Sequence, residues 1–251
     1  MKDQIFLKGT LSTFGVASRA NCRKNTDATS VALLREQGGI PFVKGNVAEA
    51  CFSINTDNRI WGQGKNPHDQ ERTIGGSSGG DAGMLASGCT PFSLGTDFGG
   101  SIRIPALFCG CTAFCGTPER HSIQGLSCYT KHNGVHSRIF HPVIGPMGRC
   151  VDDIVDGMKS LSTKNVRDYD KAIPSVPFKQ DLYDHTMKKK LKIGIIENID
   201  EICTLQKDSL NAFEDAKEAL TKAGHEIVSV KIENLHGFAV LIKCNISRYL
   251  H

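Results

Sequence analysis

Two serines lie in glycine-rich parts of this sequence, and a lysine lies near its start. Ser77 belongs to the run of residues 75–80, Ser101 ends the run of residues 95–101, and the lysine is Lys2. Glycines let backbone N–H groups point into a cavity where an oxyanion can form, and a serine beside them can attack a carbonyl carbon. A neutral lysine can activate that serine through a second hydroxyl. These residue types are those of an acyl-transfer site without histidine.

By type and spacing alone, the same residues also have ordinary structural interpretations. Ser101 could cap a helix after a glycine turn, Ser77 and Ser78 could form a capping pair, and a lysine at position 2 is usually solvated. Residues 75–79 also satisfy Gly-x-Ser-x-Gly, the nucleophile elbow of another class of hydrolases. That elbow needs a buried strand directly before it, and the polar residues 69–73 argue against one.

Composition narrows the function classes. The chain has 251 residues, 39% of them hydrophobic, which is enough to bury a core. The net charge of +4 and the lack of a basic stripe argue against a nucleic-acid partner. Ten cysteines without a secretory signal favour reduced thiols and a cytoplasmic location. The sequence holds no apolar run long enough to span a membrane.

A cysteine cluster raises the question of a metal. Cys109, Cys111 and Cys115 lie close together, but Cys-x-Cys is poor spacing for a tetrahedral site and no second ligand pair follows. We expect no metal and no cofactor. A buried free cysteine behaves as a small hydrophobic residue, and the apolar sequence around Cys109 favours that role.

The glycine runs are expected at the ends of secondary structure elements. A helix of small residues is predicted over residues 78–87, so that its N-terminus carries the first run. A buried strand over residues 92–94 leads into the second run, and another helix begins at Ser101, with Pro105 tolerated near its first turn. Upstream, a helix capped by Thr26 or Asp27 and a short strand are predicted, over residues 27–37 and 40–43 respectively.

The C-terminal part alternates strand, helix and strand. Residues 162–190 are polar and read as a connecting segment. A strand over residues 191–196, a helix over 209–222 and a strand over 226–232 form a parallel βαβ unit. The alternation predicts an α/β protein with a mixed, largely parallel sheet flanked by helices.

From Lys2 to about Pro146, the chain resembles the amidase signature family, and within it the animal fatty acid amide hydrolases. The resemblance keeps the spacing between segments as well as their residues. Its strongest parts are residues 75–80 and 95–103; it also includes residues 2–3, 8–9, 12–15, 40–43, 46–47, 62–63, 66–67, 108–110 and 145–147.

This resemblance implies an amidase signature fold that the present chain contains incompletely. Residues 1–160 would form the catalytic core, 161–190 a connection, and 191–251 a βαβ continuation of the same domain, cut at its C-terminus. We therefore expect a chain truncated at both ends relative to the family, with part of the sheet and of the substrate pocket outside it.

The resemblance also assigns roles to the three candidate residues. Ser101 matches the nucleophile. Ser77 matches the bridging serine, which the family holds at a cis peptide bond and which relays protons in both directions. Lys2 matches the base, whose neutral form must be favoured by burial and nearby dipoles.

The surroundings of the nucleophile complete the expected site. The amides of Phe98, Gly99, Gly100 and Ser101 are predicted to face the oxyanion, with added support from a helix dipole. Site support is expected from Ser78, and from Asp97 and Arg103, which would hold the loop by pairing with the backbone or with each other. An apolar acyl pocket is expected from the family's matching positions, which are Cys51, Phe52, Ile54 and Phe98.

The function that follows is a serine hydrolase that cleaves fatty acid amides to free acid and amine. The alternatives are an inactive fragment and an amidotransferase-type subunit that works with a partner and tRNA. The expected ligand is a small lipid amide. Peripheral association with the cytosolic face of internal membranes, through segments outside this sequence, and homodimer formation complete these expectations.

Overall fold

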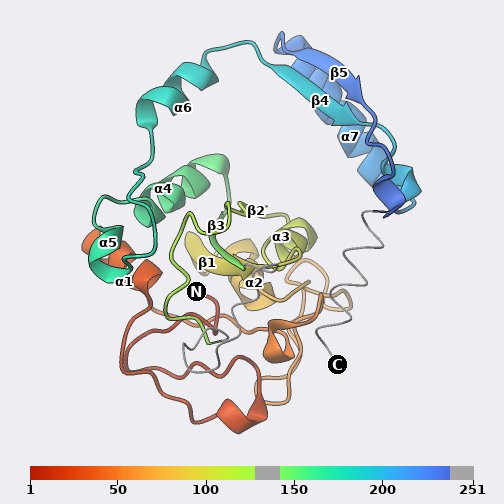
Figure 1. The fold of residues 1–251 in the computed structure, drawn as a ribbon. Helices are drawn as coiled ribbons and strands as arrows, with labels where there is room; N and C mark the ends of the chain where they lie inside the picture. Colours follow the sequence, from red (N-terminus) through yellow and green to blue (C-terminus); the bar gives the residue numbers. More distant parts are fainter. Residues whose placement is uncertain (128–141, 238–251) are drawn as a thin grey trace. The chain divides into compact units, whose positions relative to one another are not determined.

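The computed structural model describes residues 1–127 and 142–237. The chain divides into two compact units, Met1–Phe178 and Lys179–His251, and each is described by itself (Figure 1). No helix in the described ranges combines the length and the apolar character that a membrane span requires.

The first unit is built around a three-stranded sheet in the order β1-β3-β2. Strand β1 (Phe92–Asp97) pairs along its whole length with β3 (Val143–Gly148), and β2 (Thr112–Ala113) pairs with β3 as well. Both pairings are antiparallel, which corrects the expectation of a largely parallel sheet for this unit. Every residue of β3, and every residue of β1 after Phe92, is buried, so these two strands form the centre of the unit.

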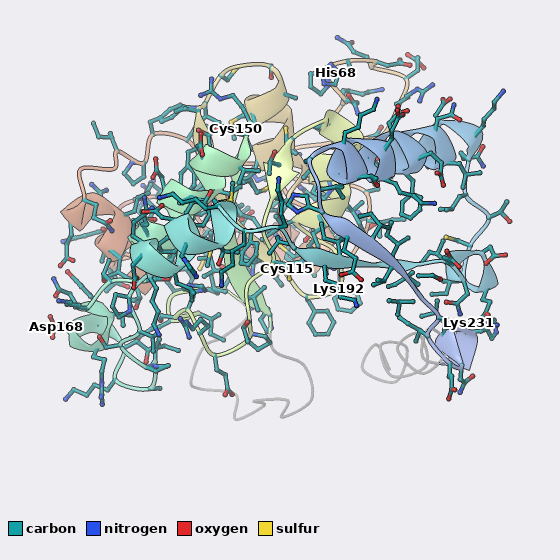
Figure 2. All side chains as sticks on the ribbon, turned by 90° about the horizontal axis from the view of Figure 1, so that it is seen from above. His68, Cys115, Cys150, Asp168, Lys192 and Lys231 are labelled. Carbon is teal, nitrogen blue, oxygen red and sulfur yellow. The ribbon has the colours of Figure 1, made fainter. Side chains whose placement is uncertain are left out.

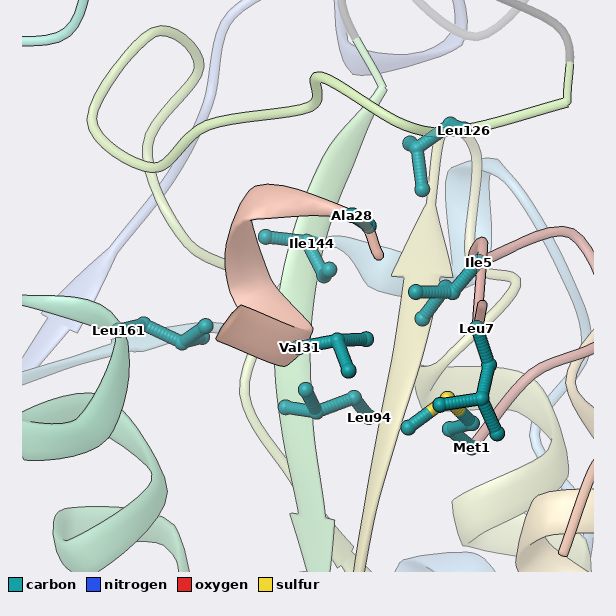
Figure 3. Packing of buried hydrophobic residues seen from close by; sticks show 9 residues of the cluster. All are labelled: Met1, Ile5, Leu7, Ala28, Val31, Leu94, Leu126, Ile144 and Leu161. Atoms are coloured by element: carbon teal, nitrogen blue, oxygen red, sulfur yellow. The ribbon is translucent and has the colours of Figure 1, made fainter. Parts of the chain in front are cut away.

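Helices pack on both faces of the β1–β3 pair. On one face, Leu94 and Ile144 pack with Val31 and Leu161 (Figure 3). On the other face, Met147 packs in a second apolar cluster with side chains from two helices, because successive strand residues alternate between faces. The helical elements that the structure describes in this unit are η1 (Ala17–Arg19), α1 (Thr29–Glu36), η2 (Glu49–Cys51), α2 (Gly79–Ala86), α3 (Arg103–Cys109), α4 (Val151–Leu161) and α5 (Val166–Tyr169).

The elements next to the glycine runs were largely predictable. Helix α2 confirms the helix expected over residues 78–87, and β1 contains the strand expected over 92–94. The helix expected from Ser101 begins two residues later, at Arg103. The delay has a local cause, since the carboxylate of Asp97 accepts hydrogen bonds from the backbone N–H groups of Ile102 and Arg103 at 3.0 and 3.4 Å.

Two upstream predictions are wrong. Residues 40–43 form no strand, and Ile40 and Phe42 are 83% and 65% exposed, so no sheet buries their side chains. The helix expected over residues 27–37 is present as α1, but Ala28 precedes it and neither predicted cap is used. The carboxylate of Asp27 instead accepts the N–H of Lys8 at 2.7 Å.

The second unit contains the predicted βαβ arrangement. Strand β4 (Lys192–Ile196) and strand β5 (Glu226–Val230) pair in parallel, with Lys192 opposite Glu226, and α7 (Lys207–Lys222) connects them. Lys192 begins β4 and Lys231 directly follows β5 (Figure 2). Helix α6 (Gln180–Met187) and the 3-10 helix η4 (Ile199–Glu201) are the other elements of this unit within residues 179–237. The α/β class is therefore confirmed.

Candidate active site

Backbone hydrogen bonds fix the chain on both sides of Lys2. The N–H of Lys2 donates to the C=O of Leu94 in β1 at 2.9 Å, and the N–H of Asp3 donates to the C=O of Gly45 at 3.1 Å. Gly45 in turn donates to the C=O of Met1 at 2.7 Å. Lys2 is thus held between the central strand and the segment around Gly45, and it is completely buried.

The side chain of Lys2 ends among uncharged oxygen atoms. Its Nζ lies 2.8 Å from Ser77 Oγ, 2.8 Å from Thr96 Oγ1 and 3.0 Å from the C=O of Thr96. Burial disfavours the charged form of a lysine, while these acceptors hold the amine at one position. The structure therefore brings together two of the three predicted catalytic residues, Lys2 and Ser77.

The loop that carries Ser77 is held from both ends. The peptide bond between Gly76 and Ser77 is cis, as the resemblance implied. Thr56 Oγ1 donates to the C=O of Gly75 at 2.7 Å and accepts the N–H of Gly79 at 3.0 Å. Ser77 itself is completely buried, with its hydroxyl directed at Lys2.

Ser101 lies on the segment that packs against this loop. The N–H of Ser78 donates to the C=O of Ser101 at 3.0 Å, which joins the two glycine–serine runs directly. A Cβ atom at Gly75 would lie 2.7 Å from Pro105 Cα, so glycine is needed there for the two segments to approach. Ser101 is half-buried, unlike Ser77, which leaves the predicted nucleophile the more accessible of the two serines.

The predicted oxyanion donors divide into two groups. The N–H of Gly100 donates to Asp97 Oδ1 at 2.7 Å, so its expected role as an oxyanion donor is corrected. Within the described residues, the backbone N–H groups of Gly99 and Ser101 have no hydrogen-bond partner. These two amides can therefore take the role that Gly100 cannot fill.

Asp97 organises the turn between β1 and α3. Besides the Gly100 amide, its carboxylate accepts Arg103 Nη2 at 2.9 Å and Arg103 Nε at 3.1 Å, the pairing expected from the sequence. Burial alone would raise the pKa of Asp97, but the Arg103 guanidinium and the amide donors outweigh it and hold the pKa below its ordinary value. The carboxylate is thus an ionised anchor for the loop of the predicted nucleophile.

The expected acyl-pocket residues are only partly assembled. The rings of Phe52 and Phe98 lie with centroids 6.5 Å apart, and both remain partly exposed. Burial raises the pKa of Cys51 to about 11, against smaller lowering effects from Lys2 and Ser77. Cys51 is therefore a neutral thiol beside the lysine–serine pair. Ile54 is 68% exposed, and its role in a pocket stays a prediction.

Cys109 confirms the expectation of an apolar cysteine. It is 1% exposed within the cluster around α2 and α3, and burial raises its pKa to about 11. No group of three or more histidine, cysteine or acidic side chains is placed to hold a metal ion in the residues that the structure describes.

Sequence reasoning missed three polar residues that shape the site: Gln4, Thr56 and Thr96. Thr96 directly precedes Asp97 in a resembling segment, so its position was a usable signal. Thr56 and Gln4 act only through neighbours distant in sequence, and no motif marked them. Thr96 Oγ1 donates to Gln4 Oε1 at 2.7 Å, which extends the network beyond Lys2.

The sequence matches a family model and is similar to known proteins. Residues 1–248 match the family model described as Amidase. The chain is 34% identical over 229 residues to the vitamin D3 hydroxylase-associated protein of Gallus gallus, and 31% identical over 229 residues to fatty-acid amide hydrolase 1 of Sus scrofa. These matches cover 91% of this chain but only 48% and 38% of those relatives.

The chain is also similar to an amidotransferase subunit and to solved structures. One subunit of the glutamyl-tRNA(Gln) amidotransferase of Treponema pallidum is 36% identical over 174 residues, which is 69% of this chain and 33% of that protein. Among solved structures, one described as fatty acid amide hydrolase superposes with a TM-score of 0.80 at 24% identity, covering 93% of this chain and 40% of the other. The chain thus shares its fold with these proteins and spans less than half of their length.

Proposed function

Because this chain belongs to the amidase family, we propose that it forms the catalytic core of a serine hydrolase that cleaves fatty acid amides to a free fatty acid and an amine. The observation that carries the proposal is the buried contact between Lys2 Nζ and Ser77 Oγ, at 2.8 Å. The segment of Ser77 is joined in turn to that of Ser101 through the hydrogen bond from the Ser78 amide.

These contacts support a two-step proton relay during acylation. Ser101 Oγ attacks the amide carbonyl carbon and passes its proton to Ser77 Oγ, whose own proton moves to the neutral amine of Lys2. The carbonyl oxygen becomes an oxyanion that faces the N–H groups of Gly99 and Ser101. Lys2 then returns the proton through Ser77 to the leaving nitrogen, and the carbon–nitrogen bond breaks.

Deacylation uses the same groups in reverse. Water attacks the acyl-Ser101 ester and loses a proton through Ser77 to Lys2. The tetrahedral intermediate collapses when Ser101 Oγ leaves and takes that proton back. A relay serine suits both steps because one hydroxyl can accept and donate in the same position.

The substrate class rests on the apolar groups near the two serines. Phe52 and Phe98 contact each other beside the site, and Cys51 is a neutral thiol there. Such a wall favours an acyl chain over a charged side chain. Association with a membrane surface and formation of a homodimer are parts of the same proposal.

A second candidate is a role within an amidotransferase complex. It is favoured by the 36% identity to the Treponema pallidum protein and opposed by the net charge of only +4. An amidotransferase subunit would differ from the hydrolase in acting with a partner protein and in binding tRNA. A filter-binding assay with tRNA at low salt separates the two, because the hydrolase proposal predicts no binding above that of an unrelated protein.

The proposed activity is tested with a series of primary fatty acid amides of increasing chain length. We expect release of ammonia that rises with chain length, and none from the Ser101→Ala variant. Equal turnover of acetamide and long-chain amides would contradict the lipid substrate class. Turnover by Ser101→Ala at the rate of the unmodified chain would contradict the nucleophile.

A further inference from the structure

A buried polar chain runs from Ser77 through Lys2 and Thr96 to Gln4. Lys2 Nζ lies 2.8 Å from both Ser77 Oγ and Thr96 Oγ1, and Thr96 Oγ1 donates to Gln4 Oε1 at 2.7 Å. Lys2 is completely buried, and Gln4 and Thr96 are each 3% exposed, so water does not replace these contacts. The proposed proton relay involves Lys2 and Ser77, and Gln4 has no assigned role in it.

Gln4 accepts the hydroxyl proton of Thr96, and this determines which atoms can donate to Lys2. A neutral lysine amine has two N–H donors and one lone pair, and that lone pair must accept the proton of the relay serine. The C=O of Thr96 has no proton to give. The one proton of the Thr96 hydroxyl is held by Gln4 Oε1. Both oxygens of Thr96 can therefore accept an N–H of Lys2, and in that arrangement the lone pair of Lys2 can face Ser77 Oγ.

We propose that Gln4 is a positioning residue that holds the Thr96 hydroxyl proton and so directs the lone pair of neutral Lys2 to Ser77. This inference rests on the proposed function, because it assigns a direction to the same proton relay. Without an acceptor at position 4, the Thr96 hydroxyl can turn and donate to Lys2 Nζ, in competition with Ser77.

Two substitutions at position 4 separate the acceptor from the side-chain volume. Gln4→Met keeps the length but has no strong acceptor, and Gln4→Glu keeps an acceptor oxygen while adding a negative charge. The readout is the rate at which a fluorophosphonate labels Ser101 as a function of pH. This measures activation of the serine directly and needs no knowledge of the natural substrate.

The two variants are expected to shift the pH profile in opposite directions. In Gln4→Met, a hydroxyl that donates to the neutral amine favours that form, so the labelling midpoint moves to lower pH. Its plateau rate falls by about fivefold to tenfold, the effect of one misdirected hydrogen bond. In Gln4→Glu, the charge favours the ammonium form, so the midpoint moves to higher pH while the plateau rate is kept.

Thr96→Val supplies the second side of a double-mutant cycle. Without a hydroxyl at position 96, Gln4→Met cannot free a proton donor that competes with Ser77 for Lys2. The double variant should therefore be labelled at the same rate as Thr96→Val. Gln37→Met is the matched control, since Gln37 donates to Leu33 and Ser160 and takes no part in the relay. Folding of each variant is checked by circular dichroism.

The outcomes distinguish this inference from the proposed function. If the unmodified chain does not label at Ser101, the proposed function fails and this inference falls with it. If the unmodified chain labels and a folded Gln4→Met labels with the same plateau and midpoint, only the role of Gln4 is overturned. Equal losses from Gln4→Met in the presence and absence of the Thr96 hydroxyl would overturn it too.

Discussion

Lys2 contacts Ser77 because three separate parts of the chain meet around its side chain. The residues after Met1 lie against β1, which also supplies Thr96, and the loop before α2 supplies Ser77. A buried lysine with uncharged acceptors is costly for stability, since burial disfavours its charge. Such a cost is typical of a functional site, which supports the role of Lys2 as a base.

Replacing Lys2 by alanine should slow fluorophosphonate labelling of Ser101 by about 100-fold to 10,000-fold, the usual contribution of a general base. Lys8→Ala is the matched control, because Lys8 is exposed and lies on the same segment. Both rates are measured by mass spectrometry over time. A Lys2→Ala chain that is folded and labels as fast as Lys8→Ala would exclude Lys2 from the mechanism.

At the residue scale, the sequence predicted the lysine and both serines, because their segments carry recognisable motifs. It placed Gly100 among the oxyanion donors, and the structure gives that amide to Asp97 instead. A hydrogen bond between residues three positions apart depends on the backbone path of one turn, which residue types alone do not determine. Gln4 was missed for a different reason, since its partner Thr96 is distant in sequence.

The first turn of helix α2 lies so close to the backbone of Asn46 that glycine is required at position 80. A Cβ atom at Gly80 would lie 2.1 Å from the backbone nitrogen of Asn46, closer than any real contact. Gly80→Ala should therefore destabilise the first unit by about 2–4 kcal/mol, as expected for overpacking against backbone. Urea unfolding measures this change.

Gly38→Ala serves as the comparison for that substitution. Gly38 has φ +85° and open space around its Cα, so alanine there adds backbone strain without a collision. We expect a loss of about 1–2 kcal/mol for it. Equal losses at both positions would mean that the close approach of α2 to Asn46 does not constrain the loop of Ser77.

The contact of His121 with the end of α4 should make the first unit sensitive to acid. His121 is 4% exposed, with Nε2 3.0 Å from Ser162 Oγ, and burial with help from Arg120 lowers its pKa from 6.5 to about 4. In the unfolded chain His121 is protonated below about pH 6.5, whereas in the folded chain it is protonated only below about pH 4. Stability is therefore lost as pH falls through this window, by about 3 kcal/mol.

The measurement is urea unfolding of the first unit at pH 7 and pH 4.5. His121→Gln should reduce the difference between the two, whereas His185→Gln, at an exposed position of α6 in the second unit, should leave it unchanged. An unchanged pH dependence in His121→Gln would assign the acid sensitivity to other groups.

At the element scale, predictions succeeded where the pattern was local. The helix of small residues after Ser78 and the alternating β5 are present, and β4 and β5 pair in parallel as expected. The antiparallel β1–β3 pairing was not foreseen because it joins strands far apart in sequence, and β3 had not been identified as a strand. Residues 40–43 show the opposite error, because their apolar side chains predicted a strand but Ile40 and Phe42 are exposed and no strand forms there.

For the molecule as a whole, the proposed chemistry lies in one of the two compact units. Lys2, Ser77, Ser101 and the hydrogen-bond partners given for them above belong to Met1–Phe178. A chain ending at Phe178 should therefore still be labelled at Ser101, at a rate within about threefold of the rate for the 251-residue chain. Loss of labelling from a folded 1–178 chain would show that the second unit contributes to the site.

The central claim is that Lys2 and Ser77 activate Ser101, and one measurement tests it most directly. The purified 251-residue chain is treated with a fluorophosphonate, its intact mass is measured, and the modified peptide is sequenced. We predict a single adduct, located at Ser101, and none in Ser101→Ala. A soluble, folded chain that forms no adduct, or one that is modified at another serine, would contradict the account.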